Sequence, residues 1–205
     1  DLFDGSKPLS EKLITAEACI HHIWFTDADY SKKGTYIKWN PAVKTLEDRE
    51  AIRAALLDGR IDVIATDHAP HSLEEKNEKY FSAPSGGPLV QHGLPAMLDL
   101  VHEGKITVER VVELMSHRVA ECFKLSERGY IREGYKADLV LVNPDAEWTV
   151  TGENIMYKCG WSPFTGHTFK SHVVGTWVNG VRVWDGVNIL TKNGNHAGER
   201  LKFNR

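Results

Sequence analysis

Two short polar segments, each of which follows an apolar run, hold residue types that can bind a metal ion or move a proton. The first is Asp67-His68-Ala69-Pro70-His71, directly after the apolar residues 61–65. A carboxylate beside two imidazoles can supply a metal ligand and a proton acceptor. An ordinary surface loop capped by Asp67 is the alternative. The position favours function, because loops at the carboxyl ends of parallel strands converge on the active face of α/β folds.

The second polar segment is His21-His22, at the end of an expected strand over residues 13–20. Neighbouring side chains of a strand point to opposite faces, so at most one of the two could face a shared site. One packed and one exposed histidine is therefore favoured over a metal role. Asn40 lies in the following loop, before Pro41. Its amide could both donate to and accept from a cyclic amide, although Asn-Pro by itself is a turn signal.

A third candidate contact is the segment Pro84-Ser85-Gly86-Gly87. Glycine lets a ligand approach the backbone closely, and an expected helix N-terminus follows. The segment matches no Walker or dinucleotide pattern, which argues against a nucleotide site, and a plain flexible loop is the alternative. The other histidines are assigned to packing or surface positions: His92, His102, His117, His167, His172 and His196. The four tryptophans of the second region are assigned to a β-sandwich core or an interface: Trp148, Trp161, Trp177 and Trp184.

The elements that position these residues fall into an α/β part and a β part. Thr45, with Asp48 three residues on, predicts a helix start, and Gly59 predicts its end. The near-continuous apolar run over residues 61–65 is typical of a buried parallel strand. Helices are expected from Pro88 to Gly104, from Thr107 to Met115 and from Ser116 to Phe123, followed by strands over residues 137–142, 148–151, 172–178 and 181–184. Asn179-Gly180 predicts a hairpin turn.

This order predicts the end of an α/β barrel or doubly wound sheet over residues 1–128, then a small β-sandwich segment over residues 129–190 and a polar, loosely ordered tail over residues 191–205. Only two strand–helix units are visible, whereas a barrel needs about eight. The sequence begins at Asp1 without methionine. We therefore expect a segment of a longer protein.

Composition excludes several classes of partner. The 205 residues are 41% hydrophobic and 26% charged, with a formal net charge of −3, so no basic field indicates nucleic acid or an anionic membrane. No long apolar run predicts a membrane-spanning helix, and no secretory signal is recognisable. The three cysteines include no C-x-x-C pair. We expect neither disulfides nor a cysteine-based zinc site, and a cytoplasmic location is the default.

Residues 61–71, I-D-V-I-A-T-D-H-A-P-H, resemble the eighth-strand motif of dihydroorotases in the amidohydrolase superfamily. Residues 15–22 are similar to the seventh-strand segment, 38–41 to the asparagine-proline loop and 134–142 to the segment that leads into the C-terminal β-sandwich. The resemblance implies the C-terminal part of a (β/α)8 TIM-type barrel, with strands 7 and 8, followed by a small β-sandwich segment.

The resemblance also implies a metal-dependent enzyme with one or two zinc ions. Asp67 would be a metal ligand and the catalytic acid/base, which accepts a proton from the attacking water and passes it to the leaving ring nitrogen. Asn40 and His71 would hold the substrate's ring and carboxylate, and the backbone at Ser85 and Gly86 would contact the ring amide. The implied reaction interconverts dihydroorotate and N-carbamoyl-aspartate in pyrimidine synthesis, in a homodimer.

Two positions depart from the family pattern: Ile20 replaces a common proline, and Ser85 stands where an aromatic residue is common. The family's other metal ligands belong to earlier strands, and His21 and His22 match a segment that does not usually bind the metal. We therefore expect the 205 residues to be inactive alone. The alternatives are another cyclic amidohydrolase (a hydantoinase, dihydropyrimidinase or allantoinase), against which Asn40 and His71 argue, and a catalytically silent dihydroorotase-like scaffold.

Overall fold

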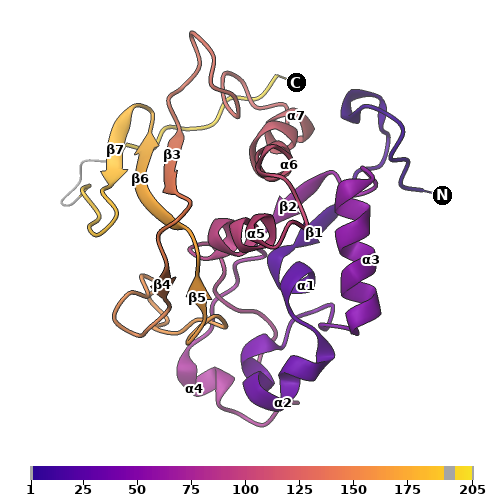
Figure 1. Ribbon diagram of the computed structural model, residues 1–205, viewed down its shortest axis with the longest axis vertical. Coiled ribbons are helices and arrows are strands. Elements are labelled where there is room, and N and C mark those ends of the chain that lie inside the picture. The colour runs from indigo at the N-terminus through magenta and orange to yellow at the C-terminus, as the bar shows by residue number, and fades with distance from the viewer. Residues whose placement is uncertain (1, 192–196, 205) are drawn as a thin grey trace.

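A pair of parallel strands lies at the centre of the computed structural model, which describes residues 2–191 and 197–204. Strand β1 (Glu17–Cys19) pairs with β2 (Val63–Ala65) in register, from Glu17 opposite Val63 to Cys19 opposite Ala65 (Figure 1). The expected parallel strands are confirmed, although both are shorter than their apolar runs. Because the strands are parallel, the residues after Cys19 and after Ala65 emerge at the same edge.

The pair His21-His22 does not extend β1, and that prediction was wrong. Both residues lie in a short helix, α1 (Ile20–Trp24), in which Ile20 and Ile23 are buried. These two apolar residues are three apart, the spacing of one helix face, and their burial favours a helical turn over continued strand. His21 is fully buried, whereas His22 is partly exposed.

The first long helix, α3 (Leu46–Leu57), confirms its sequence signals. The Thr45 side chain accepts a hydrogen bond from the Asp48 backbone N–H, and the Asp48 carboxylate accepts from the Thr45 backbone N–H, which together form a capping box. Gly59 follows the helix with φ of +84°, a left-handed conformation that glycine adopts without a side-chain clash.

The helices after β2 differ from expectation in three places. The polar loop that follows β2 contains a short helix, α4 (Leu73–Lys76). Helix α5 (Gly93–His102) begins later than Pro88. Pro95 lies in its first turn, where no backbone N–H is needed and no kink results. The two helices expected after Thr107 form one run of α6 (Val108–Val112), the π-helical turn η4 (Glu113–His117) and α7 (Arg118–Cys122).

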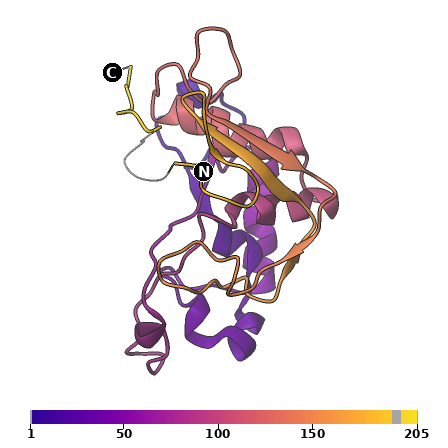
Figure 2. The same ribbon diagram turned by 90° about the vertical axis from the view of Figure 1, so that its left-hand side faces the viewer.

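The second part of the chain is antiparallel. Strands β3 (Leu139–Asn143), β6 (His172–Val178) and β7 (Val181–Trp184) form a sheet in the order β3-β6-β7, and β4 (Trp148–Thr149) pairs with β5 (Thr168–Phe169). The hairpin at Asn179-Gly180 is confirmed, since both residues have positive φ values of 50° and 81°. Figure 2 shows these strands lying over the helices. The remaining short helices are η1 (Leu9–Glu11), η2 (Asp27–Asp29), α2 (Tyr30–Lys33) and η3 (Gly34–Ile37).

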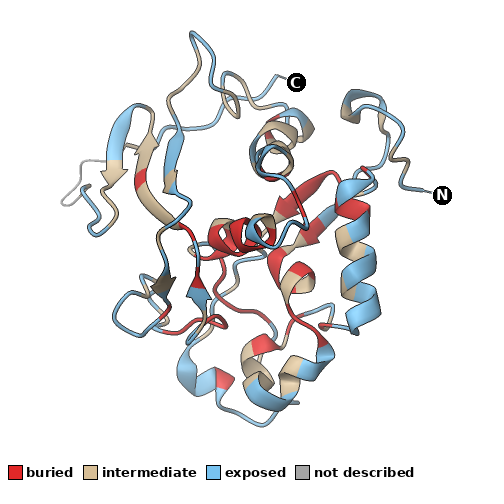
Figure 3. Cartoon of the chain, viewed as in Figure 1, coloured by how far each residue is buried: buried red, intermediate tan, exposed pale blue. Residues whose placement is uncertain are grey.

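One hydrophobic core joins the two parts. Ile20 of α1, Ile64 of β2 and Leu100 of α5 belong to the same buried cluster as Val111 of α6 and Phe169 of β5. Figure 3 shows that burial is concentrated in β2, α1 and α5, while the outer faces are exposed. Among the described residues, no helix is long and apolar enough to cross a membrane.

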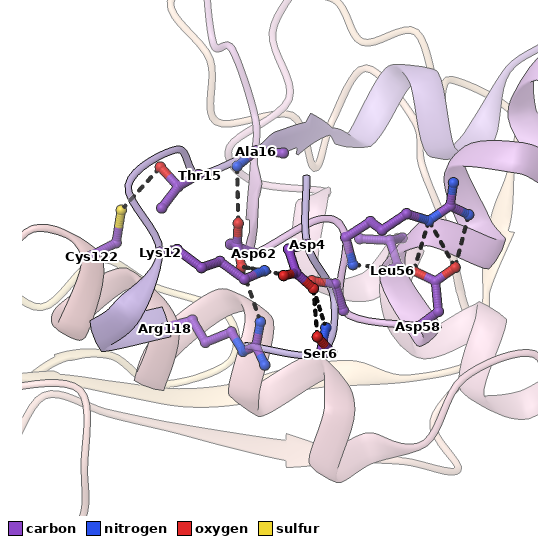
Figure 4. A network of polar contacts seen from close by, with 12 residues as sticks. Asp4, Ser6, Lys12, Thr15, Ala16, Leu56, Asp58, Asp62, Arg118 and Cys122 are labelled. Atoms are coloured by element: carbon purple, nitrogen blue, oxygen red, sulfur yellow. Dashed lines mark hydrogen bonds and ion pairs between the residues drawn. The ribbon is translucent and has the colours of Figure 1, made fainter. Parts of the chain in front are cut away.

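A buried ionic cluster fixes the start of β2 to both ends of the α/β part (Figure 4). The fully buried Asp62 accepts hydrogen bonds from Lys12 Nζ at 2.6 Å and from Arg118 Nη1 at 3.2 Å. Its second oxygen accepts from the Ala16 backbone N–H at 3.0 Å. Asp62 therefore links the N-terminal segment to α7.

The expected loose tail is only partly described. Residues 192–196, which include His196, lie outside the described residues. Beyond them the chain is paired: the Ser126 backbone N–H donates to Lys202 O at 2.9 Å, and the Asn204 backbone N–H donates to Lys124 O at 2.8 Å. The described end of the chain is therefore held against the turn after α7.

Candidate functional site

Asp67 stands at the carboxyl edge of the parallel strands, two residues after β2 ends. Its φ is +45°, in the left-handed region of backbone conformation. Residues other than glycine rarely adopt this region, but aspartate tolerates it better than most. Backbone conformations of this kind cluster at functional sites. The side chain is exposed, and within the described residues its carboxylate has no hydrogen-bond or ion-pair partner. A charged acceptor is therefore presented to solvent at this edge.

Cys19 and His21 lie beside Asp67. The Sγ atom of Cys19, a ring nitrogen of His21 and a carboxylate oxygen of Asp67 all lie within 4.8 Å of one another. Sequence reasoning left Cys19 and His21 out of the site. Their Cys-x-His spacing at a strand end was the available signal, and the wrong assignment of His21 to a strand hid it.

The ring of His21 is held in a fixed position without hydrogen bonds. It stacks on Trp39, with ring centroids 4.3 Å apart and planes 6° from parallel. Neither ring nitrogen has a hydrogen-bond partner among the described residues. Burial, and to a lesser extent the nearby His22, lowers the pKa of His21 to about 3, so the ring is neutral. Burial and the neighbouring carboxylates of Glu17 and Asp67 raise the pKa of the Cys19 thiol to about 12.

The two histidines after Asp67 have different surroundings. His68 Nδ1 accepts hydrogen bonds from the backbone N–H groups of Leu89 at 3.0 Å and Val90 at 3.3 Å. Burial lowers the pKa of His68, in agreement with a neutral acceptor. His71 Nε2 instead donates to the Ser85 carbonyl oxygen at 3.1 Å. The structure thus brings together His71 and Ser85, which the sequence placed in one site. His68 instead stabilises the backbone at Leu89 and Val90.

The segment that carries Ser85 and Gly86 is anchored on both sides. The Gly86 backbone N–H donates to Lys38 O at 2.9 Å. The fully buried Lys76 donates from Nζ to Pro84 O at 3.0 Å and to Gly86 O at 2.8 Å. Burial, followed by the charge of Lys38, lowers the pKa of Lys76 to about 8. These contacts argue against the flexible-loop alternative.

Trp161 supports the same segment from the second part of the chain. It is buried, and its Nε1 donates to the His71 carbonyl oxygen at 2.7 Å. A Cβ atom on Gly87 would approach its ring to 3.3 Å. Trp161 therefore lies at an interface between the two parts of the chain, which is one of the two positions expected for it. Sequence reasoning missed both contacts. Trp161 bonds to a residue 90 positions away, and Lys76, only eight and ten residues from its partners, lies in a charged segment that predicts a solvated side chain.

Among the described residues, Asn40 has no hydrogen bond to the other candidates. It precedes Pro41 through a cis peptide bond, and His22 Nε2 donates to Pro41 O at 3.0 Å. The Asn40 side chain is exposed. No hydrogen bond or ion pair among the described residues joins Asp67 to Asn40 or to His71. The arrangement is an open edge lined by separate polar groups.

Replacement of Gly86 by alanine tests whether the close packing of Gly86 against Ala69 stabilises the fold. Gly86 has φ of +126°, and a Cβ atom there would lie 2.6 Å from Ala69 O. We expect Gly86→Ala to lower the free energy of unfolding by about 1–3 kcal/mol in urea denaturation. Gly104→Ala is the matched control, because φ is +68° but nothing lies within 4 Å of the added atom. Equal losses in both variants would show that the contact with Ala69 is unimportant.

The sequence matches the Amidohydrolase family model over residues 13–183. It is 40% identical over 183 residues to a dihydroorotase of Halobacterium salinarum, covering 89% of this chain and 43% of that relative. Identity to a dihydroorotase of Clostridioides difficile is 39% over 173 residues, covering 84% and 40%. The chain thus spans less than half the length of these relatives. Its structure is similar to L-hydantoinase (dihydropyrimidinase) from Arthrobacter aurescens, with a TM-score of 0.84 and 27% identity over 89% of this chain and 42% of that one.

Proposed function

Because the chain belongs to the amidohydrolase family, we propose that it is the C-terminal part of a dihydroorotase, which interconverts dihydroorotate and N-carbamoyl-aspartate in pyrimidine synthesis. The observation that carries the proposal is the 40% identity to a protein named dihydroorotase across 89% of this chain. In this proposal β1 and β2 are strands 7 and 8 of a (β/α)8 barrel within residues 1–128. Residues 129–190 form a β-sandwich segment, and residues 191–205 form a tail.

Asp67 is the proposed catalytic residue and the metal ligand that matches the family motif. Its exposed carboxylate, unpartnered among the described residues, fits the role of a metal ligand at a strand end. A bound zinc ion, or a pair of them, would lower the pKa of water and polarise the ring carbonyl. Asp67 accepts the proton of the attacking water and delivers it to the leaving ring nitrogen.

The other candidate residues orient the substrate. The exposed Asn40 amide can donate to and accept from a cyclic amide. His71 would help Asn40 to hold the substrate's ring and carboxylate. Backbone groups of Ser85 and Gly86 contact the ring amide. Because Lys76 holds the carbonyl groups on both sides of Ser85, these backbone groups are positioned before substrate binds, which reduces the entropic cost of reaching the transition state.

We extend the proposal to the longer protein of which this chain would be a part. The resemblance implies that the remaining metal ligands lie on earlier strands of the barrel, and we propose on that ground that the 205 residues are inactive alone. The complete protein is a cytoplasmic homodimer whose partners are its small-molecule substrates. A catalytically silent scaffold is the second candidate, and the absence of a His-x-His pair from the preceding sequence would favour it.

A substrate panel separates dihydroorotase from hydantoinase, which the structural similarity to the Arthrobacter aurescens enzyme keeps as an alternative. The panel compares kcat/KM for dihydroorotate, hydantoin, dihydrouracil and allantoin, with the protein in which this chain is joined to its N-terminal part. We expect dihydroorotate to give the highest value, because Asn40 and His71 follow the dihydroorotase pattern. A higher value for hydantoin or allantoin would contradict the proposal.

A further inference from the structure

We infer that Cys19, His21 and Asp67 form a binding site for a transition-metal ion of the zinc type within this chain. The inference adds two ligands that the resemblance does not supply. Asp67 belongs both to this site and to the proposed function, and the inference rests on the proposed function only at Asp67.

The fold brings the three residues together from two strand ends. Cys19 is the last residue of β1 and pairs with Ala65, the last residue of β2. His21 follows in the first turn of α1, and Asp67 follows Ala65 by two residues. The turn from strand to helix at Ile20 brings the Cys19 and His21 side chains to the side of Asp67, with all three donor atoms within 4.8 Å of one another.

His21 points to a missing partner at this place. Its side chain is fully buried, and among the described residues neither ring nitrogen makes a hydrogen bond. A buried polar group without a partner destabilises the folded chain, and coordination of one ring nitrogen would relieve this cost. Stacking on Trp39 holds the ring in place, so little conformational entropy is lost when the ring binds an ion.

The donor set selects the class of ion. A thiolate, a neutral imidazole and a carboxylate suit zinc and similar divalent transition metals, whereas calcium and magnesium prefer oxygen ligands throughout. Three protein ligands leave a fourth position open for water or substrate. Ligand bonds of about 2.0–2.3 Å require the donor atoms to move slightly closer together, and rotation of the exposed Asp67 side chain can provide this. Binding displaces the thiol proton of Cys19, which is released to solvent.

Cobalt(II) titration of the 205-residue chain tests the site, because a cysteine ligand gives a near-ultraviolet sulfur-to-cobalt charge-transfer band. We expect one cobalt ion to bind per chain and to produce this band. Added zinc should displace the cobalt and abolish the band. Cys19→Ser should abolish the band. Cys122→Ser and Cys159→Ser are matched controls, because the other two cysteines lie outside the cluster, and both should keep it.

Two further variants test the other ligands. Asp67→Asn and His21→Gln should each weaken cobalt binding by about tenfold or more. Circular dichroism checks that His21→Gln still folds. If His21→Gln does not fold, the test relies on Asp67→Asn, because the Asp67 side chain is exposed. A band that persists in Cys19→Ser, or no cobalt binding to the unmodified chain, would overturn the inference. Neither result bears on dihydroorotate turnover by the longer protein, so the site and the proposed function can fail separately.

Discussion

Asp67→Asn is expected to lower dihydroorotate turnover by the longer protein by at least about 10²–10⁴-fold, the usual contribution of a general acid–base group. The amide cannot accept the proton of the attacking water, and it is a weaker metal ligand than a carboxylate. The fold should remain, because asparagine tolerates the left-handed conformation that Asp67 adopts at φ of +45°. Steady-state kinetics with dihydroorotate measures the effect, and circular dichroism checks the fold.

Asp145→Asn is the matched control for this prediction. Asp145 is also exposed, but it lies in the turn after β3, away from the strand ends that carry Asp67. Its replacement should leave turnover unchanged. If Asp67→Asn kept near-normal activity while its circular dichroism remained native, the catalytic role assigned to Asp67 would be wrong.

The largest effect on stability is expected at the buried ionic cluster. Asp62→Ala leaves Lys12 and Arg118 without the carboxylate that both contact, at 2.6 Å and 3.2 Å. Lys12 has only 2% of its side chain exposed, so its charge cannot be solvated in place. Breaking a buried ion pair by removing one partner costs about 3–5 kcal/mol. Urea denaturation should show a loss of this size.

Asp58→Ala provides the comparison on the same strand-preceding loop. Asp58 pairs with Arg60 at 2.8 Å, but about half of each side chain is exposed. Exposed pairs contribute at most about 1 kcal/mol, so this variant should lose much less stability than Asp62→Ala. Similar losses in the two variants would show that burial of Asp62 does not determine the energetic role of the cluster.

The parts of the fold that depend on local sequence could be predicted. Thr45 and Asp48 satisfy each other's backbone groups within one turn, and Asn179-Gly180 needs only its own positive φ values. The parallel pairing of β1 with β2 followed from two apolar runs separated by a helix. By contrast, the start of α5 at Gly93 depends on tertiary contacts, since His68 accepts hydrogen bonds from Leu89 and from the following residue.

The candidate site was predictable where one motif held several of its residues. Asp67 and His71 were recognised together, and the contact of His71 with Ser85 joins two segments that had each been singled out. Lys76 was not recognised, because a lysine in a charged segment is expected to be solvated. Its burial and its hydrogen bond to Gly86 O become apparent only in the structure. Cys19 was set aside because cysteine zinc sites were expected from C-x-x-C pairs. Of its two neighbours, His21 was assigned to the strand, and Asp67 comes from another strand end.

The most direct test of the proposed function is dihydroorotate turnover by the longer protein, with the 205-residue chain assayed beside it. We expect hydrolysis and the reverse ring closure by the longer protein, and no turnover by the chain alone at equal concentration. A longer protein that folds and binds metal but leaves dihydroorotate unchanged would contradict the assignment. Equal turnover by the chain alone would contradict the claim that its active site is completed by preceding strands.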